Sequence, residues 1–274
     1  MLIVKRNKMK QLTAVILLMA FLIGCKSDES VLLRLRFKKG DEQTFIIHVK
    51  AKCSASTYLD SRIEANYIAD SVINDSQYYL TSKINAVKTD IKGELMDQNV
   101  EVHYDSRKSL VDMGQAERDM DSKLDKLISS YYNITFNEKG EAEKPFTVFG
   151  KEVVQPFGPA LVQLSFPVKR VKVGDSWTVK IKNPFTNPTT NLISSDVTFN
   201  YVVDNITKDN VIIDVQLDID FNGDASKHMQ GKGNYTIDRV TGRTLEGYIS
   251  TPMNGCDEDI LISIIKDTPQ NFDY

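Results

Sequence analysis

Apolar and polar residues alternate along most of this 274-residue chain, a pattern typical of β-strands that bury one face. The longest alternating run places Val211, Ile213, Val215, Leu217, Ile219 and Phe221 opposite a polar face that holds Asp214, Gln216, Asp218 and Asp220. The pattern predicts strands over 33–37, 43–55, 59–72, 77–89, 99–104, 176–182, 197–204, 211–221, 229–238, 243–251 and 259–266. The chain is therefore predicted to be mainly β.

Turn-forming residues separate these runs. The clearest turns are Lys39-Gly40-Asp41, Asn137-Glu138-Lys139-Gly140, Asp209-Asn210, Asn222-Gly223-Asp224 and Thr241-Gly242. Connections this short favour antiparallel neighbours, because a parallel crossover needs a dozen or more residues. We expect a strongly curved antiparallel sheet, or an open barrel or sandwich.

One segment has the spacing of a helix. Its apolar residues recur every three or four positions between charged residues, namely Ala116, Met120, Leu124, Leu127, Ile128 and Tyr131. This spacing predicts one amphipathic helix over about 113–132, packed on the sheet. A second, short helix is expected from Ala160 to Phe166, after the helix breakers Pro156, Gly158 and Pro159.

The N-terminus has the layout of a signal peptide. Lys5, Arg6, Lys8 and Lys10 precede an uncharged apolar run from Leu12 to Gly24, which is shorter than the roughly 20 residues of a membrane span. Met9 could also be the true start, because a complete signal begins there.

The end of the apolar run, Leu22-Ile23-Gly24-Cys25, resembles the lipobox of bacterial lipoproteins. The resemblance implies a signal peptide at 1–24, acyl chains on Cys25 and an outer-membrane anchor in the cell envelope. Residues 25–30 would then be the lipidated cysteine and its tether, followed by one β-rich domain over 31–274. Ser27-Asp28-Glu29 resembles a surface-export signal, so both the periplasmic and the surface face stay open.

A faint internal repeat suggests two related halves, 31–112 and 167–274. Phe37-Lys38-Lys39-Gly40-Asp41 is echoed by Val171-Lys172-Val173-Gly174-Asp175, and each is followed by an alternating strand. We expect Gly174 to take a positive φ and Asp175 to bond to nearby backbone, while Trp177 packs into the core. These turns, with Phe166-Pro167 upstream, resemble an uncharacterised family of Bacteroidota lipoproteins, which implies an architecture but no activity.

The remaining cysteines, Cys53 and Cys256, form an even pair in an oxidising compartment, which allows a disulfide. Cys53 has the strand parity of its apolar neighbours, where an unbridged thiol would also be stable. The sequence leaves the choice open.

Charge and motifs narrow the function. The formal charge goes from −3 to −7 once four basic residues leave with the signal peptide, which argues against nucleic-acid binding.

His48, His103 and His228 stand apart, so we expect no metal site and no cofactor. Asp218-Ile219-Asp220-Phe221-Asn222-Gly223 matches half a calcium loop, but Met229 stands where the bidentate Glu is needed, which favours a simple hairpin. The chain shows no catalytic motif.

Three hypotheses remain. The first is a membrane-anchored, non-enzymatic binding or protein-interaction module. The second is a carrier of a lipid or other apolar ligand, similar in architecture to periplasmic carriers of the LolA and LolB kind, with a cavity lined by Phe45, Ile47, Leu217 and Ile219. The third is a hydrolase with an unrecognised active site. The expected partners are the membrane, reached through the lipid anchor, and a protein or apolar ligand.

Overall fold

The computed structural model describes residues 29–95, 98–128, 130–142, 147–148, 151–152, 163–183, 195–221, 228–252 and 256–266. The signal peptide, Cys25 and the Asn222-Gly223 turn lie outside these residues.

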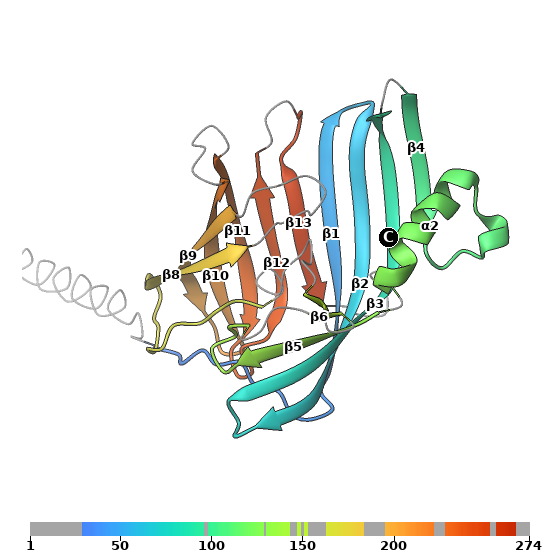
Figure 1. The fold of residues 1–274 in the computed structure, drawn as a ribbon. Coiled ribbons are helices and arrows are strands. Elements are labelled where there is room, and N and C mark those ends of the chain that lie inside the picture. The colour runs from blue at the N-terminus through green and yellow to red at the C-terminus, as the bar shows by residue number, and fades with distance from the viewer. Residues whose placement is uncertain are drawn as a thin grey trace, which may run out of the picture.

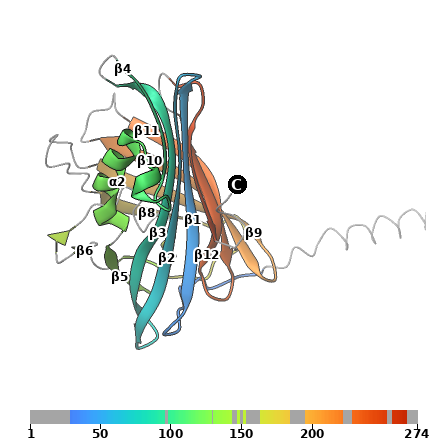
Figure 2. The same cartoon turned by 90° about the vertical axis from the view of Figure 1, so that its right-hand side faces the viewer.

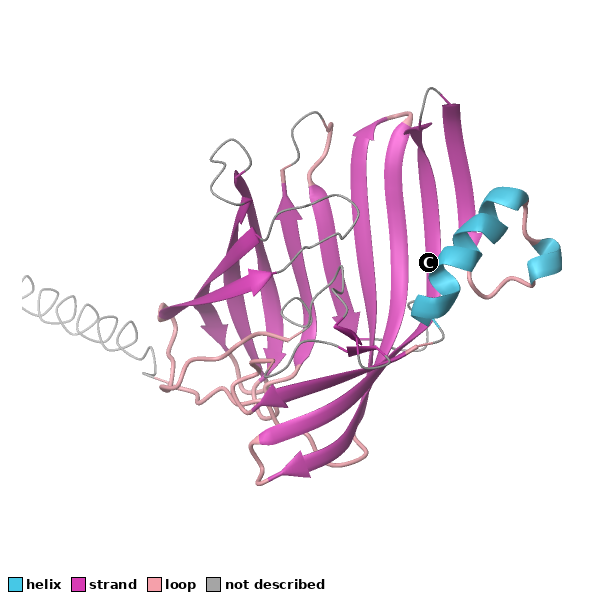
Figure 3. Ribbon diagram, in the orientation of Figure 1, coloured by secondary structure: helices cyan, strands magenta, loops and turns pink. Residues whose placement is uncertain are grey.

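A single antiparallel sheet dominates the molecule (Figures 1 and 3). Thirteen strands are described: β1 (Glu42–Ser54), β2 (Thr57–Ile73), β3 (Gln77–Leu95), β4 (Gln98–Asp105), β5 (Tyr131–Asn137), β6 (Thr147–Val148), β7 (Lys151–Glu152), β8 (Ser176–Asn183), β9 (Ser195–Ile206), β10 (Asn210–Phe221), β11 (His228–Asp238), β12 (Thr244–Thr251) and β13 (Ile260–Lys266). The sheet is open and strongly curved, so the predicted fold class is confirmed.

The strand order joins two meanders at a seam. One runs β1-β2-β3-β5-β6-β7 and the other β8 through β13, and the first strand pairs with the last, β1 with β13. β8 and β7 lie at the two ends of the order, and β4 pairs with β3 beside β5. The first meander runs past residue 112 to the end of β7, the second lies within 167–274, and the seam is in the middle of the sheet (Figure 1).

A disulfide between Cys53 and Cys256 lies at this seam. It joins the end of β1 to the segment just before β13, across 203 residues of sequence. The Lys52 carbonyl accepts a hydrogen bond from the Glu258 backbone N–H at 3.1 Å, and the Lys52 ammonium pairs with the Glu258 carboxylate at 2.6 Å. The seam is therefore fastened covalently and by polar contacts at the same end.

Irregular pairing accompanies the curvature. The register between β2 and β3 shifts at Glu64/Ala65 and again at Ala69/Ser71, and such bulges bend strands and increase their twist. β3 is 19 residues long, and its residues 77–83 pair with β5 while 88–95 pair with β4. β3 therefore pairs with β5 along its first part and with β4 along its last part.

The core lies on the face that we call the inner face, which carries Phe45, Ile47 and the odd-numbered residues of β10 from 211 to 219. The opposite face, called the outer face, carries the polar residues that alternate with them. The alternation in the sequence therefore identified the buried face of these strands.

The segment 33–37 departs from the prediction of a strand. Leu33 and Leu35 are fully buried, as their alternation implies, but they cross the end of the sheet outside any ladder. The backbone N–H of Leu35 bonds to the Glu138 carbonyl at 2.7 Å, and that of Arg36 to the Thr241 carbonyl at 2.8 Å. Because turns accept these hydrogen bonds, the segment closes one end of the core.

The helix α2 (Gln115–Ile128) follows the short 3-10 turn η1 (Leu110–Asp112). Met120, Leu124 and Ile128 pack on a smaller apolar cluster formed mainly by β3 and β4, and Figure 2 shows α2 beside these strands. The predicted helix is confirmed, but its end is corrected: Tyr131 begins β5, because the chain turns at Ser130 into the alternating run of that strand.

The second predicted helix is wrong where it can be compared. Gln163 to Phe166 are not helical, while residues 160–162 lie outside the described residues. Leu164 and Phe166 are buried in the main core, and the Phe166 backbone N–H bonds to the Lys139 carbonyl at 2.7 Å. Core contacts and a turn carbonyl stabilise this segment.

The repeated turns at 38–41 and 172–175 have matching hydrogen bonds. Gly40 and Gly174 have φ of 84° and 86°, as predicted for Gly174. Asp41 accepts the backbone N–H of Lys38 at 2.8 Å, and Asp175 accepts that of Lys172 at 3.0 Å. The two alternating strands that follow, β1 and β8, therefore begin from the same kind of turn.

Trp177 packs against the core, as its parity predicts. Its ring stacks on Tyr201 with centroids 5.1 Å apart, and its indole N–H donates to the Ser165 carbonyl at 2.8 Å. The only tryptophan of the chain therefore has a structural role in joining β8 to β9 and to the segment at 163–166.

Candidate functional site

The residues predicted to line a cavity share the inner face but differ in their surroundings. Phe45 and Ile47 are buried in the main core, and the Phe45 ring meets Tyr67 edge-on with centroids 5.7 Å apart. Leu217 and Ile219 lie farther along β10, where Ile219 is only partly buried. Of these four residues, Leu217 alone also borders the pocket described next.

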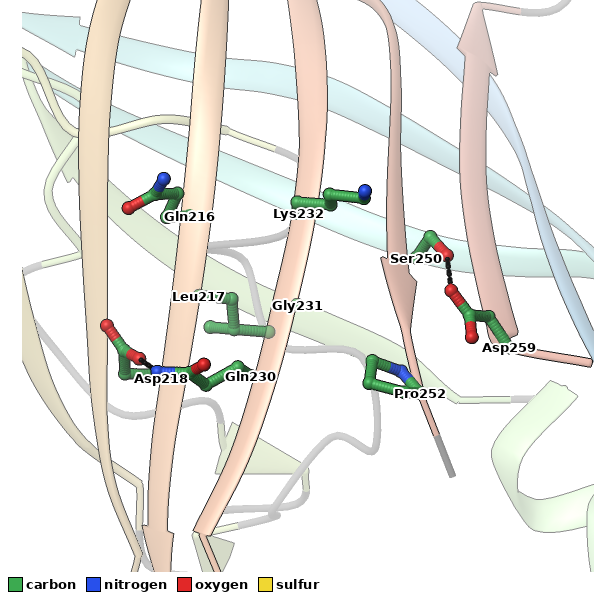
Figure 4. Close-up of a pocket in the computed structure, with 9 residues that line it drawn as sticks. All are labelled: Gln216, Leu217, Asp218, Gln230, Gly231, Lys232, Ser250, Pro252 and Asp259. Carbon is green, nitrogen blue, oxygen red and sulfur yellow. Dashed lines mark hydrogen bonds between the residues drawn. The ribbon is translucent and has the colours of Figure 1, made fainter. Parts of the chain in front are cut away.

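A polar pocket of about 380 Å³ lies where β10, β11 and β12 approach the start of β13 (Figure 4). It opens to solvent. Its lining combines carboxylates, amides, a hydroxyl and an ammonium group with few apolar side chains: Gln216, Leu217, Asp218, Gln230, Gly231, Lys232, Ser250, Pro252 and Asp259. Most of these side chains belong to the outer face, which explains why the pocket is polar.

The end of one strand creates this space. The ladder between β11 and β12 begins at Lys232 and Ser250, whereas β11 continues beside β10 as far as His228. Pro252 follows β12 directly and cannot donate a backbone hydrogen bond to extend the ladder. The gap left beside the first residues of β11 is the pocket.

Asp218 is held in place by its neighbours on both sides. Gln230 Nε2 donates to its Oδ1 at 2.9 Å, and Asn200 Nδ2 reaches its Oδ2 at 3.3 Å. Asn200 is held in turn by the Thr178 hydroxyl at 2.8 Å. Four adjacent strands, β8 to β11, therefore contribute to one hydrogen-bonded row that fixes the orientation of the carboxylate.

A second carboxylate lies at the opposite wall. The Ser250 hydroxyl donates to Asp259 Oδ2 at 2.6 Å, which ties the segment before β13 to β12. Figure 4 shows the Lys232 side chain extending from β11 toward β12. Two anionic groups and one cationic group thus border the same opening, together with amides that can donate and accept.

All three histidines stand apart from one another, as expected, and each faces a carboxylate. His48 Nε2 lies 2.6 Å from Asp60, His103 Nδ1 lies 2.8 Å from Asp90, and His228 Nδ1 lies 2.8 Å from Asp220. Each is a cross-strand or hairpin pair on the outer face.

Their environments differ. Burial lowers the pKa of His48 from its ordinary value, against the opposing effect of Asp60. The hydrogen bond to Asp90 raises the pKa of His103. Within the part of the chain that the structure describes, no group of three or more His, Cys, Asp or Glu side chains could hold a metal ion.

Sequence reasoning did not find this pocket, although it singled out part of it. The half-match to a calcium loop includes Asp218, the alternation places it on the polar face of a hairpin strand, and it does lie on that face. The contribution of Ser250 and Asp259 depends on the order of β10 to β13. Pro252 after an alternating strand was the one local signal for a gap in the sheet.

Comparisons with known proteins give no family assignment. No protein-family model matches the chain, and a search of curated proteins gives no match either. Among the helices of the described residues, none is long and apolar enough to cross a membrane.

Proposed function

We propose that this chain is a lipoprotein of the cell envelope, anchored to the outer membrane through acyl chains on Cys25, whose β domain is a non-enzymatic binding module. The polar pocket at the end of β12 is the observation that supports a binding role. Its hydrogen-bonding groups are already oriented by one another, so a ligand would meet an arrangement that needs little reorganisation.

The pocket chemistry suits a ligand or partner group rich in hydroxyls or amines. Asp218 and Asp259 accept hydrogen bonds, Lys232 donates, and Gln216 and Gln230 do both. Such a group could belong to a sugar, a polyol or a side chain of a protein partner. The apolar lining is too small for a lipid chain to be the natural occupant of this site.

The anchor is tested by Cys25→Ala. Labelling growing cells with a fatty-acid analogue should mark the wild-type protein and leave the variant unlabelled, and either uncleaved or soluble. Equal labelling of both proteins would refute the lipid anchor.

The pocket is tested by amide chemical shifts of the purified full chain during addition of monosaccharides, polyols and alkyl amines. Shifts should cluster at 216–218, 230–232 and 250–252. For the compound that binds, Asp218→Asn should weaken affinity roughly tenfold to hundredfold, because a hydrogen bond to a charged group contributes about 1.5–3 kcal/mol.

Asp214→Asn is the matched control. Asp214 lies on the same strand and the same face but outside the pocket lining, so its replacement should leave the affinity unchanged. Equal effects of the two substitutions, or shifts scattered away from the three segments, would remove the pocket as the binding site.

A second candidate function, an apolar carrier, is favoured by the burial gradient along the inner face. On β10 the exposed fraction rises from 0% at Val211 and Ile213 to 7% at Leu217, and Ile219 beyond them is partly buried. Displacement of a fluorescent fatty acid would test it. Binding abolished by Ile219→Trp, with the circular dichroism of the fold intact, would support a carrier, whereas an absence of binding to the wild type would exclude it.

A further inference from the structure

The first described residues are fixed to one end of the sheet. Glu29 pairs with Arg239 in the turn after β11 at 2.6 Å. Arg170 donates to the Ser30 hydroxyl at 3.1 Å and to its carbonyl at 2.5 Å. Val31 and Val171 exchange two backbone hydrogen bonds at 2.8 Å. The chain therefore enters the domain beside the segment 168–173 and the turn 238–243, at the lower left of Figure 1.

Three valines at this end are exposed to solvent. Val168 is 71% exposed, Val173 is 49% exposed and Val240 is 67% exposed, although valine is usually buried in a folded domain. Val168 and Val173 flank the residues that hold Ser30 and Val31, and Val240 directly follows the partner of Glu29. All three therefore lie near the point where the chain enters.

Basic residues surround these valines. The segment 168–173 contains Lys169, Arg170 and Lys172 and no acidic residue, and Lys208 and Arg239 belong to neighbouring turns. The acidic neighbours are Glu29, which pairs with Arg239, Asp175, which accepts the Lys172 backbone N–H, Asp238, which accepts the Val240 and Thr241 backbone N–H groups, and Asp209. These four acidic residues stand against the five basic ones, so this end carries a small positive surplus in a chain whose formal charge is −3.

The position of the proposed anchor places this end close to a bilayer. Three residues separate Cys25 from Glu29. At about 3.5 Å per residue, four steps of fully extended chain reach at most about 14 Å. A lipid on Cys25 would therefore keep Glu29 within about that distance of the membrane interface, with the end of the sheet that carries the valines beside it.

We propose that Val168, Val173 and Val240, with the lysines and arginines around them, form a membrane-docking surface for a bilayer that contains anionic lipids. The valine side chains enter the headgroup region, and the basic side chains bind the lipid phosphates. This inference rests on the proposed lipidation of Cys25. The acyl chains provide attachment, and the docking surface sets the orientation of the domain on the membrane.

Site-specific fluorescence on the full-length, lipidated protein tests the proposal. Val240→Cys carries an environment-sensitive fluorophore, and the protein is reconstituted into vesicles of phosphatidylethanolamine and phosphatidylglycerol that contain a nitroxide-labelled lipid. The emission should shift to the blue and be quenched by the nitroxide. High salt should reduce the quenching because it screens the charges.

Val111→Cys is the matched control, because Val111 is an 86% exposed valine on η1, away from the anchor end. The same fluorophore there should neither shift nor be quenched. The double variant Lys169→Glu and Lys172→Glu should lower the quenching at position 240 to the level measured on phosphatidylcholine vesicles. Quenching that is equal at 240 and 111, or unaffected by the charge reversal, would overturn the docking surface.

Mass spectrometry of the N-terminal peptide separates the two proposals. A protein that carries acyl chains but shows no quenching at 240 leaves the lipoprotein assignment standing and overturns docking. If no acyl chain is found, the lipoprotein assignment fails, and the same labelled protein is added directly to anionic vesicles. Quenching at 240 then supports docking alone, and its absence overturns docking as well.

Discussion

Removal of the Cys53–Cys256 disulfide should strongly destabilise the fold. The bridge closes a segment of 203 residues and fastens the seam where the first strand, β1, meets the last, β13. In the chain-entropy treatment, a loop of this length lowers the entropy of the unfolded chain by an amount equivalent to roughly 5 kcal/mol of stability. The double substitution Cys53→Ala with Cys256→Ala should therefore lower the free energy of unfolding by several kcal/mol.

Urea titration measures this change. With a urea dependence of roughly 2–3 kcal/mol per molar for a domain of this size, the unfolding midpoint should fall by about 2 M. Trp177 fluorescence reports on β8 and β9, whereas circular dichroism reports on the whole sheet, so coincident transitions would show that the two meanders unfold together.

The control at the same seam is Lys52→Ala, which removes an exposed ion pair with Glu258 but leaves the bridge. Its effect should be small, because exposed ion pairs are well solvated in the unfolded and the folded chain. Reduced wild type should match the double variant. Two thiols that react in the denatured, unreduced protein would refute the bridge, and a double variant that unfolds at the midpoint of Lys52→Ala would refute its stabilising effect.

Two further predictions concern single side chains. Gly247→Ala should destabilise the fold by about 1–3 kcal/mol in the same urea assay, because the added Cβ would lie 2.3 Å from the buried Tyr235 ring. Gly93→Ala is the control and should have little effect, because its Cβ would meet its nearest atom at 3.7 Å. Equal effects of the two substitutions would contradict the role of packing at Gly247. Burial lowers the pKa of His48 below 6.5 in the folded protein. Between that lowered pKa and 6.5, the unfolded chain therefore binds more protons than the folded chain. The stability due to His48 is complete above pH 6.5 and is lost as the pH falls through this window. Asp60→Asn should lower this pKa further, and an NMR titration of the imidazole in which it rises would contradict the assignment.

The sequence predicted the strands well because one physical rule governs most of them. Residues of β10 and its neighbours bury one face, so the period of two is strong. The same rule failed at segment 33–37, where Leu33 and Leu35 alternate and are buried, but the backbone N–H groups of Leu35 and Arg36 bond to turns instead of a strand. Alternation reports burial on one side of an extended chain, and it does not reveal whether a ladder partner is present.

The boundary between α2 and β5 was misplaced for a related reason. Tyr131 falls at helical spacing from Leu127 and Ile128, and it also opens the alternating run of Tyr132, Ile134 and Phe136. Tyr131 therefore fits both the helical period of 3.6 residues and the strand period of two. The pairing of β5 with β3 decides the matter, and that contact joins residues about 50 positions apart.

The pocket could not be predicted for a different reason. Each of its polar residues is an ordinary outer-face residue by alternation. What makes Asp218, Lys232 and Asp259 a set is the strand order, together with the end of β12 at Pro252. Neither can be derived from local spacing.

The pocket and the proposed anchor lie at different ends of the same strands, and this restricts what the pocket can bind. From Asn210, beside the anchor end, to Asp218, the chain takes eight steps along β10, which span about 27 Å at about 3.4 Å per residue. A lipid on Cys25, with a tether that reaches at most about 14 Å, would hold the Asn210 end of β10 near the bilayer. When the docking surface lies on the membrane, Asp218 and Lys232 stand at the far end of β10 from it, which keeps them apart from the lipids of the anchoring membrane. A ligand of this pocket therefore has to arrive from the aqueous phase or from a second surface, which favours a soluble hydroxylated molecule or a protein partner over a lipid taken from the same bilayer.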